Sequence, residues 1–423
     1  MIALLRQRNF GLLWWGGLIS FIGDWVLFVS LPLYILDLTG SVVAMGLLFV
    51  INIIPMLAFS SLGGVFVDRW DRKRILVVTN LLLVPLYLLL LFFDTASMVW
   101  VVYVVGFLGN TVRQLLNPAE NALLPRLVGE ENLATANALN SLNNNLARLI
   151  GPAVGGVIFA TFGFRLSVVI DVFTFLAAAI LISLISAPAS LTRAEHHPST
   201  EHTEHTSALK KFQAEWLEGL KIIKGNRVLI SMIALLGINN VVDGFVTVLF
   251  AVYVERALGG GAPELGALLT SQALGGLIGG IFIGRITRRF ASWQLVGAGF
   301  VLLGVLDFLT FGIPVLPLNM FFLVIVGIPI VGLDVGAMTL FQTITEDRYR
   351  GRIFGIYGTT AGVLMLLGRG LATIVGGQVD IVMLLAGMSL LYIPTGLLAF
   401  RLLRTPANAP AQSLAEEPVR MSA

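Results

Sequence analysis

The sequence contains no cysteine and few charged residues. Without cysteine, disulfide bonds and thiolate metal sites are excluded. Charged residues make up 12% of the chain, whereas a soluble domain carries about a quarter because it must cover itself with polar surface. A soluble globular protein is therefore excluded, and we expect lipid to be the outer solvent. The net charge of +3 is too small to indicate nucleic acid as a partner.

Long apolar runs fill most of the chain. Hydrophobic residues make up 57% of it, and the mean hydropathy is +0.90. A helix needs about 20 mostly apolar residues to cross a bilayer. Twelve runs meet this requirement: 10–36, 41–66, 75–93, 98–118, 137–162, 167–187, 228–254, 265–284, 293–313, 319–341, 354–377 and 381–400. The first run is too long for a signal peptide, whose apolar region spans about 7–15 residues. We therefore predict an all-α polytopic membrane protein with twelve transmembrane helices.

The basic residues predict the orientation in the membrane. With the N-terminus inside, 22 of the 27 lysines and arginines fall on the cytoplasmic side, and only Arg165 and Arg256 fall outside. The other three, Arg113, Arg148 and Arg369, lie within spans. Cytoplasmic loops carry such an excess of basic residues in correctly oriented membrane proteins. Both termini are therefore expected in the cytoplasm.

A polar stretch over residues 188–227 separates the sixth run from the seventh. Its first part holds the four histidines His196, His197, His202 and His205. No metal site is expected there, because nothing in such a segment fixes ligand geometry. Its second part repeats apolar residues at spacings of three and four, at Leu209, Phe212, Trp216, Leu220 and Ile223. This pattern, with lysines nearby, predicts an amphipathic helix on the cytoplasmic membrane surface that connects the two halves.

The two halves of the chain repeat each other. Residues 63–73 align with residues 279–289, and residues 148–156 with residues 369–377. Asp24 and Tyr34 in the first span align with Asp243 and Tyr253 in the seventh. The offsets of 216, 221 and 219 residues are nearly constant, and six spans intervene each time. The halves are therefore parallel repeats, an arrangement that places a substrate cavity between them and alternates its access by rocking.

These repeats divide the chain into four parts. We predict a six-helix bundle over residues 1–187, a cytoplasmic linker with the surface helix over 188–227, a second six-helix bundle over 228–404 and a cytoplasmic tail over 405–423. The two bundles are pseudo-symmetric and parallel. We expect the protein to act as a monomer.

The loop after the second span carries a specific motif. It reads Gly64-x-x-x-Asp68-Arg69-x-Asp71-Arg72-Lys73. The sequence from Arg6 to Arg404 resembles the major facilitator superfamily, specifically its bacterial drug and macrolide efflux branch, which also includes siderophore exporters. The superfamily pattern has glycine where Asp71 stands. The resemblance implies a bacterial inner-membrane transporter.

Two further motifs support this resemblance. Gly151-Pro152-x-x-Gly155-Gly156 in the fifth span is similar to the helix-5 motif of proton-coupled antiporters. The glycines allow close approach of a neighbouring helix, and the proline bends its own helix. Arg113 matches the helix-4 arginine of the superfamily, although the glycine that usually follows it is missing.

The loop motif also predicts a cytoplasmic gate. Topogenic charge explains its basic residues but not Asp68, which we expect to pair with neighbouring helix ends in one conformation and to release in the other. Arg148 and Arg369 occupy matching positions and are expected to organise the same gate. The predicted gate residues are Gly64, Asp68, Arg69, Arg72, Arg148 and Arg369.

Four ionisable residues inside the spans need an explanation, because each costs about 2.5–3.5 kcal/mol on insertion scales. They are Asp24, Arg113, Asp243 and Asp334. The resemblance places their helices, the first and fourth of each half, around the central cavity. Asp24 and Asp243 are the candidates for proton binding, in competition with substrate. Arg113 is expected to pair with Asp334 or with Glu120, and a purely structural ion pair is the alternative.

Two further aspartates, Asp171 and Asp307, are expected nearer the outer face and rank lower as site residues. The remainder of the cavity is predicted to be apolar and aromatic, with some amides that donate hydrogen bonds. Its predicted residues are Phe28, Tyr34, Asn117, Asn239, Asn240, Phe245, Tyr253 and Gln272.

Together these features favour a secondary active transporter that exports small amphipathic or cationic compounds by proton antiport. No phosphate-binding Gly-x-x-x-x-Gly-Lys-Ser/Thr loop occurs, so an ion gradient must supply the energy. No constellation of catalytic residues occurs either, so we expect neither an enzyme nor a cofactor. A lipid, lysolipid or siderophore transporter is the alternative within the fold. A membrane receptor or scaffold is disfavoured, because it has no use for costly interior charges.

Overall fold

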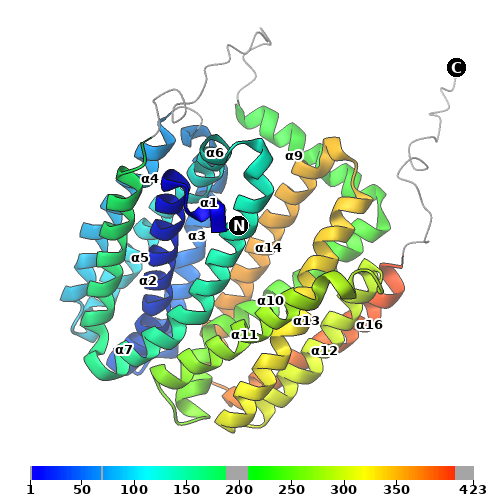
Figure 1. Ribbon diagram of the computed structural model, residues 1–423. Coiled ribbons are helices and arrows are strands. Elements are labelled where there is room, and N and C mark those ends of the chain that lie inside the picture. Colours follow the sequence, from blue (N-terminus) through cyan, green and yellow to red (C-terminus); the bar gives the residue numbers. More distant parts are fainter. Residues whose placement is uncertain (1, 68–69, 187–207, 405–423) are drawn as a thin grey trace, which may run out of the picture.

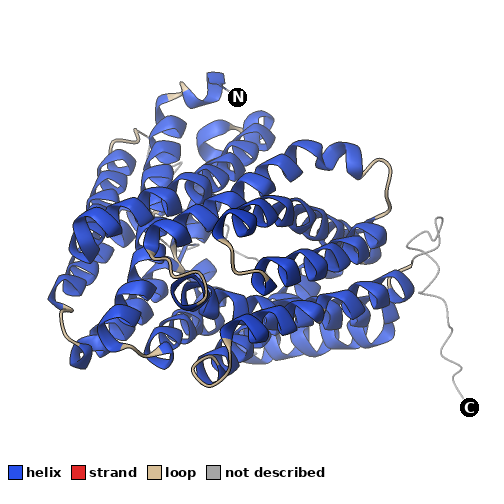
Figure 2. Ribbon diagram, turned by 90° about the horizontal axis from the view of Figure 1, so that it is seen from below, coloured by secondary structure: helices blue, strands red, loops and turns tan. Residues whose placement is uncertain are grey.

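The protein is built from helices throughout the part of the chain that the structure describes. A computed structural model describes residues 2–67, 70–186 and 208–404. Figure 2 shows helices joined by short loops, and no strand among the described residues. Large apolar side chains such as Met383 and Ile281 are 75% and 72% exposed on the outside, which fits a surface that faces lipid.

The N-terminal half comprises seven α-helices and three short 3-10 segments among the described residues. They are α1 (Ile2–Leu5), α2 (Arg8–Thr39), α3 (Val42–Val67), α4 (Arg72–Leu88), η1 (Leu89–Phe92), η2 (Ala96–Met98), α5 (Val99–Arg113), α6 (Leu116–Val128), η3 (Glu130–Asn132) and α7 (Leu133–Ser183). The C-terminal half follows α9 (Ala208–Gly225) and comprises α10 (Arg227–Arg256), α11 (Ala262–Ile286), α12 (Ser292–Gly312), α13 (Leu316–Ile344), α14 (Asp347–Val375), α15 (Ile381–Leu390) and α16 (Tyr392–Leu402).

Eleven helical stretches in the described residues are long and apolar enough to cross a membrane. One of them, α7, contains two spans, because the backbone at Gly163 leaves the helical conformation with φ of 78° and ψ of 179°. Glycine adopts this positive φ without steric cost, and α7 folds back on itself there (Figure 1). The described residues therefore hold the predicted twelve transmembrane helices, in two parallel pseudo-symmetric bundles of six.

The repeat is visible in matching contacts. The hydroxyl of Tyr34 donates to the backbone oxygen of Phe93 at 3.0 Å, and the hydroxyl of Tyr253 donates to that of Thr310 at 2.9 Å. Each bond ties the first helix of a half to the end of the third transmembrane segment of the same half. The two halves thus share internal contacts as well as sequence spacing.

The two halves meet along two helix pairs, α7 with α11 and α3 with α14. We call the end where α2 begins the termini end and the opposite end the far end. The inter-half contacts run from the far end to the middle of the helices. The hydroxyl of Thr270 on α11 donates to the backbone oxygen of Leu149 on α7 at 3.0 Å. On the other pair, Arg369 of α14 donates to the backbone oxygen of Phe49 of α3 at 3.0 Å.

The predicted amphipathic helix corresponds to α9, which packs against the C-terminal half. Glu218 pairs with Arg352 of α14 at 2.9 Å, and Ile223 is buried in the main apolar core. The four histidines of the linker lie outside the described residues.

Candidate functional site

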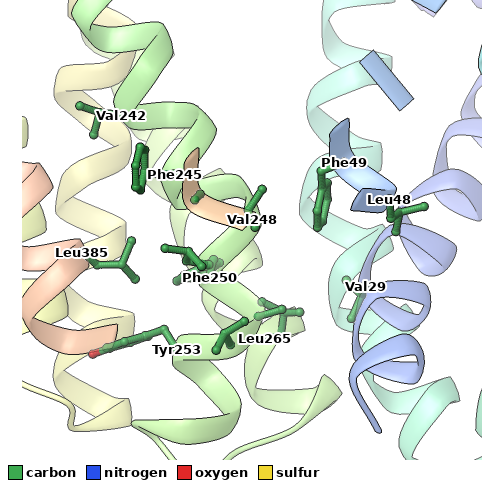
Figure 3. Packing of buried hydrophobic residues seen from close by; sticks show 14 of the residues in the cluster. Val29, Leu48, Phe49, Val242, Phe245, Val248, Phe250, Tyr253, Leu265 and Leu385 are labelled. Carbon is green, nitrogen blue, oxygen red and sulfur yellow. The ribbon is translucent and has the colours of Figure 1, made fainter. Parts of the chain in front are cut away.

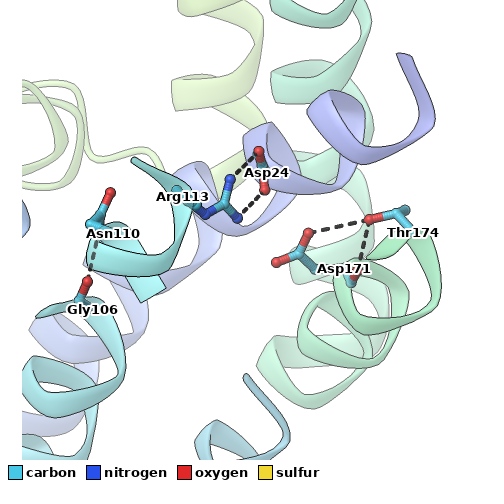
Figure 4. A network of polar contacts seen from close by, with 6 residues as sticks. All are labelled: Asp24, Gly106, Asn110, Arg113, Asp171 and Thr174. Carbon is cyan, nitrogen blue, oxygen red and sulfur yellow. Dashed lines mark hydrogen bonds and ion pairs between the residues drawn. The ribbon is translucent and has the colours of Figure 1, made fainter. Parts of the chain in front are cut away.

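A cavity of about 440 Å³ lies in the N-terminal half. It is lined by residues of α2, α3, α4, α5 and α7, and by Met365 and Arg369 of α14 from the other half. Its wall is mostly apolar, with leucines, valines and Phe28, so that the few polar groups on it stand out. They include Asp24, Arg113 and Asp171, which Figure 4 shows together.

Asp24 and Arg113 form a two-point ion pair in this cavity. Both guanidinium nitrogens Nη1 and Nη2 of Arg113 donate to the carboxylate of Asp24, one to each oxygen. The guanidinium also lies over the rings of Tyr87 and Phe175, at 5.6 and 5.1 Å from their centroids. Bidentate pairing and ring contact both hold an arginine in one orientation. The side chains are 20% and 22% exposed, so the pair lies at the cavity wall.

The prediction that Arg113 pairs with Asp334 or Glu120 was therefore wrong. Arg113 pairs with Asp24 of its own half, which joins the first and fourth transmembrane helices of that bundle. Asp334 lines a different cavity, in the other half. Glu120 lies seven residues after Arg113, on α6, which follows a break in the helix at residues 114–115. Its carboxylate accepts a hydrogen bond from Asn140 at 3.0 Å.

Asp171 is a site residue that the sequence ranked too low. Its side chain has no exposed surface, and it lines the same cavity as Asp24 and Arg113. It sits in the second span of α7, where α7 packs closely on Gly23 of α2, beside Asp24. Thr174 is its described hydrogen-bond donor, at 3.4 Å to Oδ1. Its position eight residues after the turn at Gly163 carries it well into the bundle, and the signal was an aspartate inside the predicted span 167–187.

A second cavity, of about 460 Å³, lies mainly in the C-terminal half. Three carboxylates line it: Asp243 on α10, Asp307 on α12 and Asp334 on α13. The remaining wall is largely apolar and aromatic, with Phe250, Phe311 and Tyr392 among its residues. The cavity adjoins the first one, because Phe28, Pro32, Phe49 and Met365 line both.

Asp307, like Asp171, was ranked below the other interior charges. Asp307 lies on the third helix of its half, and the sequence offered only its position within an apolar run. The structure places it on the wall of the same cavity as Asp243 and Asp334. Three acids on three different helices thus converge on one apolar space.

Arg148 and Arg369 each line the cavity of the opposite half. Arg148 belongs to α7 but lines the C-terminal cavity, where it acts electrostatically on Asp243 and Asp334. Its guanidinium also lies 5.8 Å from the ring centroid of Trp25. Arg369 belongs to α14 but lines the N-terminal cavity. The predicted gate role of Arg148 and Arg369 stays a prediction. Both residues lie where the two cavities adjoin.

Several predicted cavity residues lie on the cavity walls. Phe28 lines both cavities, and Asn239, Asn240 and Gln272 line the C-terminal one. Asn117 and Glu120 line a third cavity of about 400 Å³ inside the N-terminal half, together with Arg113.

Three aromatic residues predicted for the cavity pack in the core instead. Tyr34 stacks on Phe164 at 4.1 Å between ring centroids, and Phe245 and Tyr253 are 6% and 0% exposed. Figure 3 shows Phe245 and Tyr253 among the packed apolar side chains of the C-terminal half. The reason is helical geometry: Phe245 follows Asp243 by two residues, which turns it about 200° to the far side of the helix.

The helix-5 motif provides the close helix contacts that were predicted. A Cβ atom at Gly155 would lie 2.7 Å from Cα of Val26 on α2, so only glycine fits this approach. Gly151 also faces α2, whereas Gly156 faces the backbone of Ala262 at the start of α11. The motif therefore packs one face of α7 on its own half and another on the opposite half. Pro152 lies between them, inside the helix.

The loop motif is described only in part. Asp68 and Arg69 lie outside the described residues, as does the surface environment of Gly64, and their predicted gate roles stay predictions. Asp71, where the superfamily pattern has glycine, caps α4: its carboxylate accepts a hydrogen bond from the backbone N–H of Arg74 at 2.9 Å. Aspartate is a favoured N-cap residue, so the departure has a structural role. Arg72 is the first residue of α4 and is buried.

Two parallel six-helix bundles with adjoining interior cavities define a polytopic membrane transporter. The whole-chain comparison then gives the family: the family model described as "Transmembrane secretion effector" matches residues 1–421. The chain belongs to this family of the major facilitator superfamily, and it is not an enzyme.

Known proteins agree with this assignment. Macrolide efflux protein A of Streptococcus pyogenes is 25% identical over 382 residues, which are 89% of this chain and 91% of that protein. The staphyloferrin A transporter of Staphylococcus aureus is 24% identical over 361 residues, 82% and 84% of the two chains. The crystal structure of a bacterial homologue of the iron transporter ferroportin in an inward-facing state has the same fold, with a TM-score of 0.71 at 16% identity over 94% of this chain and 98% of that one.

Proposed function

We propose that this transporter exports small amphipathic or cationic compounds by proton antiport with alternating access. The observation that carries the proposal is the C-terminal cavity. Asp243, Asp307 and Asp334 line it, and Arg148 is the one basic side chain among its lining residues. A space of about 460 Å³ with an apolar wall suits a drug-sized ligand whose body is greasy and whose charge is positive.

The wall of the cavity supports a cation in two ways. Asp243 and Asp334 are exposed to the cavity, so a bound cation can contact them. Their attraction for a positive charge strengthens as the ligand displaces water, because the effective dielectric constant falls. Aromatic rings such as those of Phe250 and Tyr392 attract a cation through their faces. A substrate with an amine or a quaternary centre on an apolar skeleton fits both features.

In this proposal, protons move across the membrane in exchange for the substrate. The interior carboxylates take up protons from one side of the membrane and release them when a cationic substrate or a conformational change intervenes. Asp24 and Asp243 are the pair predicted from the repeat, one in each cavity. The Asp24–Arg113 ion pair connects the first and fourth transmembrane helices of the N-terminal half and would couple their movement to this exchange.

The inter-half contacts support an inward-facing conformation. They gather between the far end and the middle, on α7 with α11 and on α3 with α14. In the predicted orientation the far end faces the outside, so the outer path is closed and the cavities open toward the cytoplasm. An exporter would load its substrate in this state.

The proposal is tested by transport in liposomes that contain the purified protein and a pH gradient. We expect accumulation of tetraphenylphosphonium, a lipophilic cation, and no accumulation of the uncharged tetraphenylmethane skeleton. Asp334→Asn should weaken binding of the cation about tenfold or more, because a charge-assisted contact contributes about 1.5–3 kcal/mol. Asp94→Asn, which changes an exposed loop aspartate, is the matched control and should behave as the parent.

Two results would contradict the proposal. One is cation transport that is indifferent to the pH gradient, and the other is an Asp334→Asn variant whose cation affinity equals that of the parent.

A siderophore transporter is the second candidate, favoured by the similarity to the staphyloferrin A transporter. It predicts transport of an iron chelate by the same liposomes. Lipid or lysolipid transport, which no single observation favours, is covered by including a fluorescent lysolipid in the panel.

A further inference from the structure

The charged cluster in the N-terminal cavity is unbalanced. It holds two carboxylates, Asp24 and Asp171, and one guanidinium, that of Arg113, which lies near both. Arg369 lines the same cavity from α14, but its guanidinium donates to the backbone oxygen of Phe49 at 3.0 Å and forms no ion pair with Asp24 or Asp171 among the described contacts. Tyr87 is the other titratable group that faces the cluster, from α4. One negative charge therefore remains within the cluster.

The two carboxylates differ in how they are satisfied. Both oxygens of Asp24 accept hydrogen bonds from Arg113, so neither is available to a proton without breaking the pair. Asp171 has no exposed surface, and its Oδ2 has no hydrogen-bond partner among the described residues. The donor to its Oδ1, the hydroxyl of Thr174, lies 3.4 Å away and donates more closely, at 2.7 Å, to the backbone oxygen of Asp171. Figure 4 shows the carboxyl group of Asp171 facing the Asp24–Arg113 pair.

A buried charge with so few partners is costly, and taking up a proton is the usual relief. A proton on Oδ2 would remove the extra negative charge and leave one carboxylate for one guanidinium. The close contact of Gly23 with Thr174 and Asp171 holds the group against α2, so that a shift of α2 relative to α7 would change its surroundings. Asp24 and Arg113 are anchored on α2 and α5, which allows the pair to separate when the bundle rearranges.

We propose that Asp171, rather than Asp24, carries the exchangeable proton of the N-terminal half. The neighbouring Asp24–Arg113 ion pair has a structural role and connects the first and fourth transmembrane helices. Uptake forms one O–H bond on the Asp171 carboxylate with a proton taken from water on one side of the membrane. Release breaks the same bond and returns the proton to water on the other side. This inference rests on the proposed proton antiport and names the residue that serves it.

The test uses the full-length chain in liposomes with tetraphenylphosphonium as the probe. Two quantities are measured: proton movement caused by adding the cation, and exchange of labelled for unlabelled cation without any gradient. Asp171→Asn should move fewer protons per cation than the parent and keep the exchange, because a permanently neutral side chain mimics the protonated state. Asp94→Asn, in an exposed loop, should keep both.

Infrared difference spectra between acidic and alkaline samples provide the signature that a merely structural role would not change. The parent should show the carbonyl band of a protonated carboxyl group, and Asp171→Asn should lose it. Thr174→Val removes the neighbouring donor but keeps the carboxyl group, and it should shift that band. This second variant keeps the test valid if Asp171→Asn does not fold.

Different failures have different meanings. If Asp171→Asn moves as many protons per cation as the parent, or if Thr174→Val leaves the band unmoved, the assignment to Asp171 is overturned while proton antiport stands. A parent protein that transports the cation without moving protons overturns the proposed antiport itself, and the inference with it.

Discussion

At the scale of single residues, the interior charges are organised by half. The N-terminal cavity pairs its arginine with Asp24 and keeps Asp171 buried beside the pair. The C-terminal cavity gathers three carboxylates, and its single basic side chain, Arg148, comes from the opposite half. The C-terminal cavity is thus the more acidic of the two. This difference suits the proposed roles, in which the N-terminal cavity couples transport to protons and the C-terminal cavity binds the cation.

The Asp24–Arg113 pair leads to a stability prediction. Removing one partner leaves the other charge poorly compensated, and for buried pairs this costs about 3–5 kcal/mol. Because about a fifth of each side chain is exposed, we expect Asp24→Asn and Arg113→Gln each to cost up to about 3 kcal/mol. The double variant should lose less than the sum, with a coupling energy of about 0.5–3 kcal/mol. Thermal unfolding in detergent measures these changes.

The control for this cycle is Asp334, which lines the other cavity. The cycle of Arg113→Gln with Asp334→Asn should be additive within about 0.5 kcal/mol, as expected for residues without shared contacts. Coupling between Arg113 and Asp334 together with additivity between Arg113 and Asp24 would contradict the observed pairing.

At the scale of helices, glycine determines how closely the halves approach. A Cβ atom at Gly266 of α11 would overlap the backbone carbonyl of Pro152 on α7. Backbone cannot move aside as a flexible side chain can, so this contact requires a residue without a side chain. The helix-5 motif and the start of α11 therefore form one tight junction between the halves.

Gly266→Ala should loosen this junction. Overpacking a tight contact costs about 1–3 kcal/mol, so the population that opens at the far end should rise about five- to 150-fold, at about 1.4 kcal/mol per factor of ten. The chain has no cysteine, and spin labels at Thr161→Cys and Arg256→Cys therefore report the far-end distance without background. The distance distribution between them should shift to longer values.

Gly276→Ala is the matched control, because a Cβ atom at Gly276 of the same helix has nothing within 4 Å. It should leave the distances unchanged. Equal distance distributions in Gly266→Ala and Gly276→Ala would mean that the junction does not hold the far end closed.

At the scale of the whole molecule, each half contributes an arginine to the cavity of the other half. Arg148 and Arg369 occupy equivalent positions in the repeat, and each lines the cavity of the opposite half. This reciprocity means that separating the halves changes the charge of both cavities at once. A rocking movement and the electrostatics of the two cavities are therefore linked by geometry.

The loop motif predicts movement at the opposite end of the molecule. Asp68→Asn should shift the population toward the conformation that is open at the termini end, because the predicted partners of its carboxylate would be lost. Spin labels at Glu131→Cys and Thr287→Cys, exposed positions near that end in different halves, should show longer distances. Asp94→Asn is the control, and distances that do not change in Asp68→Asn would count against a gate at this loop.

The sequence predicted the helices well because the bilayer imposes one requirement on every span. A span must be apolar over about 20 residues, and this can be read without knowing its neighbours. The turn at Gly163 agrees with this: the runs 137–162 and 167–187 were predicted as two spans, and a single glycine outside the helical conformation turns the chain between them. The sequence also predicted that Asp24, Arg113, Asp243 and Asp334 lie in the interior, because charge in hydrocarbon is costly wherever it stands.

The sequence by itself determined the class of protein, the twelve spans, the parallel repeat and four of the interior charges. Only the tertiary structure decided which charges meet. Arg113 pairs with Asp24 and not with Asp334, Asp171 lies beside that pair, and Tyr253 faces the core. The physical reason is that hydropathy is a property of each residue, whereas pairing depends on how each helix is rotated and placed. Rotation follows from packing contacts with partners far along the chain, such as Asp24 and Arg113, which are 89 residues apart, and no local pattern contains them.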